Sequence, residues 1–302
     1  MRRQVLLGFA LIVAVLLVMG CGSNSSGSSG SGLKVVAAEN FWGSIARQLG
    51  GTKVSVTSII SNPATDPHDY EPTAKDARNI AGAAYVIENG VGYDGWLGKL
   101  VSANHSSNQR VLNIGDLLGL KNGDNPHRWY SPDDVQKVIA QITSDYKLAD
   151  AADAAYFDQQ RATFERDALA KYSGLVTQIR QRYSGVPVGA SESIFTPLAQ
   201  ALGLKLLTPA SFLDAISEGS DPTAGDKATC DQQIKEHQIK VYVYNSQNAT
   251  PDVKRLNEAA EAAGIPIATV TETLTPAGAS FEEWMVDELR GIEAALSKGS
   301  GR

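Results

Sequence analysis

The stretch from Ala149 to Tyr183, ADAADAAYFDQQRATFERDALAKYSGLVTQIRQRY, decides the fold. It contains no proline, its apolar residues recur at helical spacing, and its single glycine, Gly174, is the only residue that offers a kink. A helix of this length would extend about 50 Å at 1.5 Å per residue, which is longer than one small lobe needs. The sequence therefore predicts a bridging helix, residues 149–184, that joins two lobes.

On both sides of this segment, short apolar strand patterns alternate with helix patterns. Before it, the expected strands are 33–38, 53–60, 84–88 and 110–114, with helices at 41–49, 72–82 and 93–103 and a further helix that starts at 131–134. After it, the expected strands are 187–190, 205–208, 240–244 and 266–270, with helices at 194–202, 223–237, 251–263 and from the capping box at 280–283. This alternation predicts an α/β protein with two lobes, residues 33–148 and 185–302, each with a mostly parallel sheet flanked by helices.

Two loop sequences repeat one pattern: Asp66-Pro67-His68-Asp69-Tyr70 and Asn125-Pro126-His127-Arg128-Trp129. Each falls between an expected strand and an expected helix, where α/β proteins place their sites. Proline stiffens the turn that presents each histidine, and metal ligands need fixed positions. One such histidine alone would more often cap a helix or pack on its aromatic neighbour. The repetition predicts instead that His68 and His127 bind one metal ion.

The amino-terminal segment is typical of export. Positive charge at Arg2 and Arg3 precedes an uninterrupted apolar run, which predicts a signal peptide over residues 1–20. The sequence Val18-Met19-Gly20-Cys21 resembles a bacterial lipobox, which implies cleavage before Cys21 and lipid attachment to its thiol. An ordinary secretory signal with an incidental cysteine is the alternative. We expect an extracytoplasmic protein that is anchored to the membrane by its lipid.

The segment after Cys21 and the overall charge agree with this location. Residues 22–32 are only Gly, Ser and one Asn, so residues 21–32 form a lipidated cysteine and a flexible tether. Cys230 is then left alone, and no internal disulfide is expected. The net charge is −6, and loss of Arg2 and Arg3 with the leader makes it −8. An acidic surface argues against nucleic acid as a partner and is compatible with gathering cations.

The two histidine motifs, Pro-His-x-Tyr-Glu-Pro at Pro67–Pro72 and Asn-Pro-His-x-Trp at Asn125–Trp129, resemble those of one family. The family is that of the substrate-binding lipoproteins of zinc and manganese ABC importers. The resemblance runs from Leu33 to Leu296 and includes the long central helix. It implies capture of a divalent metal ion in the cleft between two lobes and delivery to an ABC transporter permease. It also implies a monomer that catalyses no reaction.

The resemblance implies two more ligands in the second lobe. Glu192 begins the segment Glu192–Pro197, which is similar to the family pattern Glu-Gly-x-Phe-x-Tyr, and Glu272 stands where the family usually has an aspartate. Each has a simpler interpretation. Glu192 could be a carboxylate stabilised by a helix dipole, and Glu272 a solvated loop residue. The predicted metal ligands are thus His68, His127, Glu192 and Glu272.

The sequence leaves the identity of the metal open. Two imidazoles and two carboxylates suit zinc or manganese, and zinc binds such a set more tightly. Only His105 lies between the two motifs, so the histidine-rich loop of many zinc-specific relatives is absent, which slightly favours manganese. His105 and His237 are interpreted as a surface residue and a helix-end residue. A secreted zinc hydrolase, which needs an open metal position and a general base, and a surface adhesin remain as alternatives.

Overall fold

The computed structural model describes residues 32–302 except 66, 68, 69, 105 and 249. The predicted signal peptide, Cys21 and all but the last residue of the tether lie outside this range, as does the predicted ligand His68. Among the described residues, none of the helices combines the length and apolar character needed to cross a membrane.

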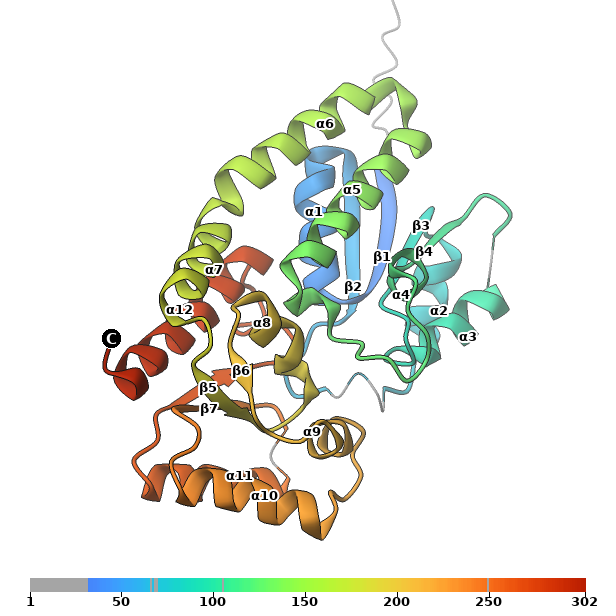
Figure 1. Ribbon diagram of the computed structural model, residues 1–302. Helices are drawn as coiled ribbons and strands as arrows, with labels where there is room; N and C mark the ends of the chain where they lie inside the picture. Colours follow the sequence, from blue (N-terminus) through green and yellow to red (C-terminus); the bar gives the residue numbers. More distant parts are fainter. Residues whose placement is uncertain (1–31, 66, 68–69, 105, 249) are drawn as a thin grey trace, which may run out of the picture. The chain divides into compact units, whose positions relative to one another are not determined.

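The amino-terminal lobe is built on a four-stranded parallel sheet with the order β2-β1-β3-β4 (Figure 1). Its strands are β1 (Leu33–Glu39), β2 (Val54–Ile60), β3 (Tyr85–Glu88) and β4 (Arg110–Asn113). Its helices are α1 (Asn40–Gly50), α2 (Ala74–Ala81), α3 (Gly95–Asn104), α4 (Ile114–Leu118) and α5 (Pro132–Ala149). The two faces of β1 pack against different helices. Val35 and Ala37 belong to one core cluster with α1 and α5, and Val36 belongs to another with α2 and α3. Burial on both faces explains the continuous apolar pattern of this strand.

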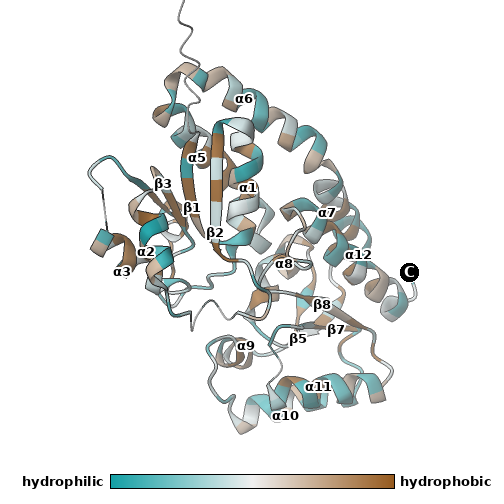
Figure 2. Cartoon of the chain, turned by 180° about the vertical axis from the view of Figure 1, so that it is seen from behind, coloured by the Kyte–Doolittle hydropathy of each residue, from teal (hydrophilic) through white to brown (hydrophobic). Residues whose placement is uncertain are grey.

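The carboxy-terminal lobe repeats this plan with the order β6-β5-β7-β8. Its strands are β5 (Pro187–Ala190), β6 (Lys205–Leu206), β7 (Val241–Asn245) and β8 (Ile267–Val270). Its helices are α8 (Thr196–Ala201), α9 (Ala210–Ser217), α10 (Ala224–Lys235), α11 (Pro251–Ala262) and α12 (Phe281–Ser300). Helices α10 and α11 lie side by side, and their outer surfaces are largely hydrophilic (Figure 2). Each sheet is parallel throughout, which confirms the predicted fold of two α/β lobes.

The connection between the lobes is helical, but it is not one continuous α-helix. A short 3₁₀ turn (Ala151–Asp153) leads into α6 (Ala154–Thr163), a π-helical segment (Phe164–Ala168) and α7 (Ala170–Tyr183). The interruption has a physical cause in the burial pattern. Phe164 and Leu169 are both buried although they are five residues apart, and the amide of Leu169 donates to the carbonyl of Phe164 at 2.9 Å. One extra residue in the turn keeps both side chains in the core. The predicted continuous helix is therefore wrong at this point, whereas Gly174, which offered a kink, stays within α7.

The two lobes share one hydrophobic core. A single cluster of buried side chains extends from β1 and α1 to β5, β7 and α12, and residues 32–302 form one unit. Hydrogen bonds also cross between the lobes. The amide of Phe281 donates to the hydroxyl of Ser44 at 2.9 Å, and Gln48 donates to Glu282 at 2.8 Å. Contacts between α1 and the start of α12 therefore help to hold the two lobes together.

Candidate metal centre

The imidazole of His127 is oriented by Asn125, the residue that begins its motif. Oδ1 of Asn125 lies 2.9 Å from Nδ1 of His127 and accepts from the His127 amide at 3.0 Å. The amide nitrogen of Asn125 donates to the carbonyl of Ser193 at 2.7 Å, which fixes Oδ1 as the acceptor. The proton of the neutral ring is therefore on Nδ1, and Nε2 keeps its lone pair. Nε2 is buried and forms no hydrogen bond with any described residue.

The aromatic residue of each histidine motif packs against neighbouring rings. The ring of His127 packs edge-on against Trp129, with 5.3 Å between centroids, and Trp129 stacks on Phe41 at 4.1 Å. In the first motif, Tyr70 packs against Trp96 at 4.8 Å. His68 itself lies outside the described residues, so its position as a ligand stays a prediction.

Glu272 follows β8 and faces His127 from the other lobe. Its Oε1 lies 3.7 Å from Nε2 of His127 and accepts a hydrogen bond from Asn245 at 3.1 Å. Its Oε2 accepts from the hydroxyl of Tyr93 at 2.7 Å, and its amide donates to Gln247 at 2.7 Å. The side chain is only 15% exposed, so the alternative of a solvated loop carboxylate does not describe it.

Glu192 follows β5, and the residue is 1% exposed. It is the N-cap residue of a 3₁₀ turn (Ser193–Phe195), where its side chain makes no capping hydrogen bond. Its Oε2 accepts from the side-chain amide of Asn248 at 2.9 Å. Glu192 and Glu272 line one cavity of about 340 Å³, together with residues 63–65 and 67 of the loop that leads to the first histidine.

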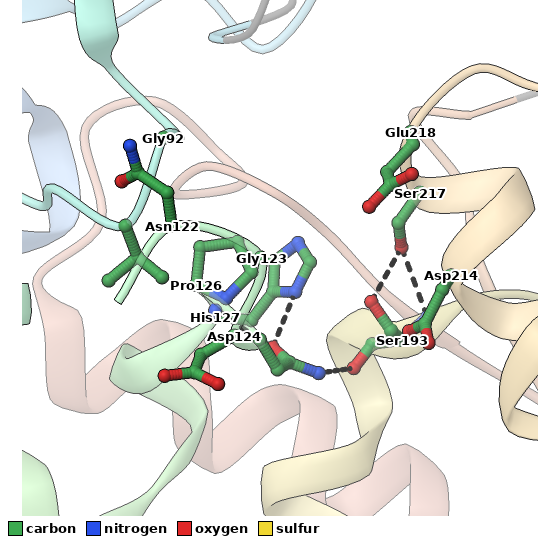
Figure 3. Close-up of a pocket in the computed structure, with 12 residues that line it drawn as sticks. Gly92, Asn122, Gly123, Asp124, Pro126, His127, Ser193, Asp214, Ser217 and Glu218 are labelled. Atoms are coloured by element: carbon green, nitrogen blue, oxygen red, sulfur yellow. Dashed lines mark hydrogen bonds between the residues drawn. The ribbon is translucent and has the colours of Figure 1, made fainter. Parts of the chain in front are cut away.

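His127 lines a neighbouring cavity of about 290 Å³, and Ser217 contributes to the walls of both cavities. Acidic side chains of α9 and the loop after it, Asp214 and Glu218, stand at its margin (Figure 3). The described residues thus bring His127 close to Glu272 and place Glu192 beside the same cavity as Glu272. No three of the described histidine, cysteine, aspartate and glutamate side chains form a complete metal cluster, and the remaining predicted ligand is His68.

The structure adds supporting residues that the sequence did not single out as functional. Tyr93, Asn245 and Asn248 hold the two predicted carboxylates, and Asn125 holds His127. Of these residues, only Asn125 stands out in the sequence, because it is the first residue of the repeated motif. The others become neighbours only through the fold.

The chain was compared with known proteins and structures. A family model described as "Zinc-uptake complex component A periplasmic" matches residues 35–295. The manganese-binding lipoprotein MntA of Halalkalibacterium halodurans is 31% identical over 150 residues, 47% of this chain and 49% of that protein. The zinc-binding lipoprotein AdcA of Streptococcus pneumoniae is 25% identical over 277 residues, 82% of this chain and 52% of that protein. The chain thus spans about half the length of these two relatives.

Solved structures share the fold. The periplasmic zinc binding protein TroA from Treponema pallidum superposes with a TM-score of 0.74 at 18% identity, over 88% of this chain and 99% of that one. A manganese-bound periplasmic metal binding protein from Candidatus Liberibacter asiaticus gives 0.73 at 20% identity, over 87% and 99%. The resemblance inferred from the two histidine motifs is confirmed. Because the family model matches residues 35–295, the protein belongs to the zinc-uptake complex component A family of periplasmic proteins.

Proposed function

We propose that this protein binds one zinc or manganese ion between its lobes and delivers it to an ABC transporter permease. The observation that carries the proposal is the state of His127. Its Nε2 is buried, forms no hydrogen bond with a described residue and lies 3.7 Å from a carboxylate oxygen of the opposite lobe. A neutral imidazole held by its other nitrogen is the usual form of a histidine metal ligand.

The donor set explains why a divalent ion fits. His68 and His127 would come from the amino-terminal lobe, and Glu192 and Glu272 from the carboxy-terminal lobe. Two carboxylates neutralise the charge of the ion, and two imidazoles suit a borderline transition metal. Relatives named for manganese and for zinc support both ions as cargo. Four protein donors fill a tetrahedral site and leave no position for a catalytic water, so we favour transport over the hydrolase alternative.

The cellular setting follows from the leader and the relatives. We propose that the lipid on Cys21 anchors a monomer outside the cytoplasm. The relatives named above are called lipoproteins, which supports this anchor. The anchor would hold the metal-binding lobes close to a permease in the same membrane.

Metal analysis of protein purified from its own cell envelope tests the proposal. We expect about one equivalent of zinc or manganese in the wild-type protein and none in His127→Ala, because a site built on His127 loses a direct ligand. His237→Ala is the matched control, since His237 is exposed near the end of α10. Circular dichroism checks that both variants fold. Absence of both metals from the wild-type protein, or equal metal in His127→Ala, would contradict the proposal.

A further inference from the structure

Glu39, the last residue of β1, is fully buried and has no hydrogen-bond partner among the described residues. Both of its carboxyl oxygens are buried in this way. Buried polar groups in proteins are nearly always hydrogen-bonded, and a buried carboxylate without a partner is strongly disfavoured. The described part of the chain therefore supplies no partner for the carboxyl group of Glu39.

The charges around Glu39 also disfavour its carboxylate form. Burial raises its pKa well above the usual value, and nearby Asp94, Glu88 and Glu272 raise it further, while a contact with its own backbone amide lowers it. All three neighbours are acidic, and no lysine or arginine among the described residues pairs with Glu39. In the metal-free protein these surroundings favour the protonated form, and a bound cation nearby would favour the carboxylate.

Backbone contacts place Glu39 beside loops of the candidate metal centre. In the sheet, Glu39 pairs with Ile60, the last residue of β2, where the loop with the first histidine motif begins. The next residue, Asn40, accepts a hydrogen bond from the amide of Leu274 at 3.2 Å, two residues beyond Glu272. The end of β1 therefore touches the loops of two predicted ligands.

The side-chain direction agrees with this position. Alternation along β1 puts Glu39 on the same face as Ala37, whose core cluster includes Tyr93 and Trp129. The hydroxyl of Tyr93 donates to Glu272, and the charges of Glu272 and Glu39 both raise the pKa of Tyr93. Glu39 therefore lies on the inner side of the site, close to the pair formed by Tyr93 and Glu272.

We propose that Glu39 supplies an additional carboxylate oxygen to the bound divalent ion and shifts the preference of the site toward manganese. This inference rests on the proposed function. Two imidazoles and two carboxylates complete the tetrahedral site that zinc prefers, whereas manganese favours more oxygen donors and a higher coordination number. A fifth donor therefore stabilises bound manganese more than bound zinc.

The inference predicts opposite effects on stability and on binding. Glu39→Gln removes a buried acid that has no partner in the metal-free protein, so the thermal midpoint of the metal-free form should rise. The same change removes an oxygen donor, so metal affinity should fall. A residue with a purely structural role would lower the midpoint instead, which makes the pair of measurements diagnostic.

Competition titrations with Mn²⁺ and with Zn²⁺ provide the main test. We expect Glu39→Gln to lower manganese affinity about ten-fold or more, and zinc affinity by less. The matched control is Glu88→Gln at the end of the neighbouring strand β3, where Asn113 donates to the carboxylate at 2.6 Å. This control should keep both affinities close to those of the wild-type protein.

The outcomes separate this inference from the proposed function. A wild-type protein that binds neither ion overturns both. A wild-type protein that binds them, with a Glu39→Gln variant that has unchanged affinities, overturns only the role of Glu39. Equal losses for the two ions would also overturn it, because they would indicate a general charge effect and not an additional oxygen donor.

Discussion

Replacing Asn125 by alanine should weaken metal binding by about ten- to a hundred-fold, although Asn125 donates nothing to the metal. Its side chain makes three hydrogen bonds, two with His127 at 2.9 and 3.0 Å and one with the Ser193 carbonyl at 2.7 Å. A neutral hydrogen bond contributes about 1 kcal/mol. The contact with Nδ1 fixes the tautomer and the contact with Ser193 fixes the loop, and together they correspond to about 2 kcal/mol. At 1.4 kcal/mol per factor of ten, this is about thirty-fold in affinity.

The loss has a specific physical origin. Without Asn125, the metal-free imidazole of His127 populates tautomers and rotamers that cannot bind. Affinity then falls by the fraction of molecules in the competent form. Asn125→Asp is the informative companion, because it keeps a strong acceptor for Nδ1 but cannot donate to Ser193. We expect the aspartate variant to bind more tightly than the alanine variant.

Competition against a chromogenic chelator measures both affinities, and ¹⁵N NMR of the His127 ring reports which nitrogen carries the proton. Wild-type affinity in Asn125→Ala would refute the argument. Equal losses in the alanine and aspartate variants would show that the bond to Ser193, and not the orientation of the ring, controls binding.

Four further predictions concern the same region. Tyr93→Phe removes the donor to Glu272 and should reduce metal affinity about three- to ten-fold by titration, since it deletes one hydrogen bond to a charged group. Glu272→Gln should cost about ten- to a hundred-fold, with the larger loss for manganese than for zinc in parallel titrations. Burial raises the pKa of Glu288 from 4.5 to about 8, so the folded state retains a proton that the unfolded state loses. The metal-free protein should therefore lose stability as pH rises from about 4.5 to 8. A plot of the urea midpoint against pH should have a shallower slope for Glu288→Gln than for the wild-type protein. Small-angle scattering should show little change in radius of gyration on metal binding, because one core cluster joins both lobes; a large contraction would contradict this.

The sequence predicts the long apolar elements well and the short ones poorly. The strands of both sheets begin and end within two residues of their expected positions, because burial on both faces leaves a continuous apolar pattern. Helices α4 and α9 are absent from the predictions. The first has five residues and the second eight, which is too short for a periodic pattern to stand out. The π-helical segment was also missed, since its signal is the spacing of two buried residues and burial is known only from the structure.

The four ligands could be predicted because each follows an expected strand and carries a donor atom. Their supporting residues could not, because they act through contacts between distant loops. Tyr93 and Glu272 are 179 residues apart, and Asn125 and Ser193 are 68 apart. Nothing in the local sequence around Tyr93 indicates that its hydroxyl holds a carboxylate of the other lobe.

These long-range contacts have a consequence for unloading. Tyr93 of the amino-terminal lobe orients Glu272 of the carboxy-terminal lobe, and Asn125, which orients His127, is itself held by Ser193 across the same boundary. Movement of the lobes apart therefore lengthens the donor-to-donor distances and releases the side chains from their orienting bonds in one step. Retention of the ion then falls more steeply as the lobes separate. The fall would be shallower if each of the four donors were held within its own lobe. A permease that pulls the lobes apart by a small amount would obtain a large increase in the rate at which the ion leaves.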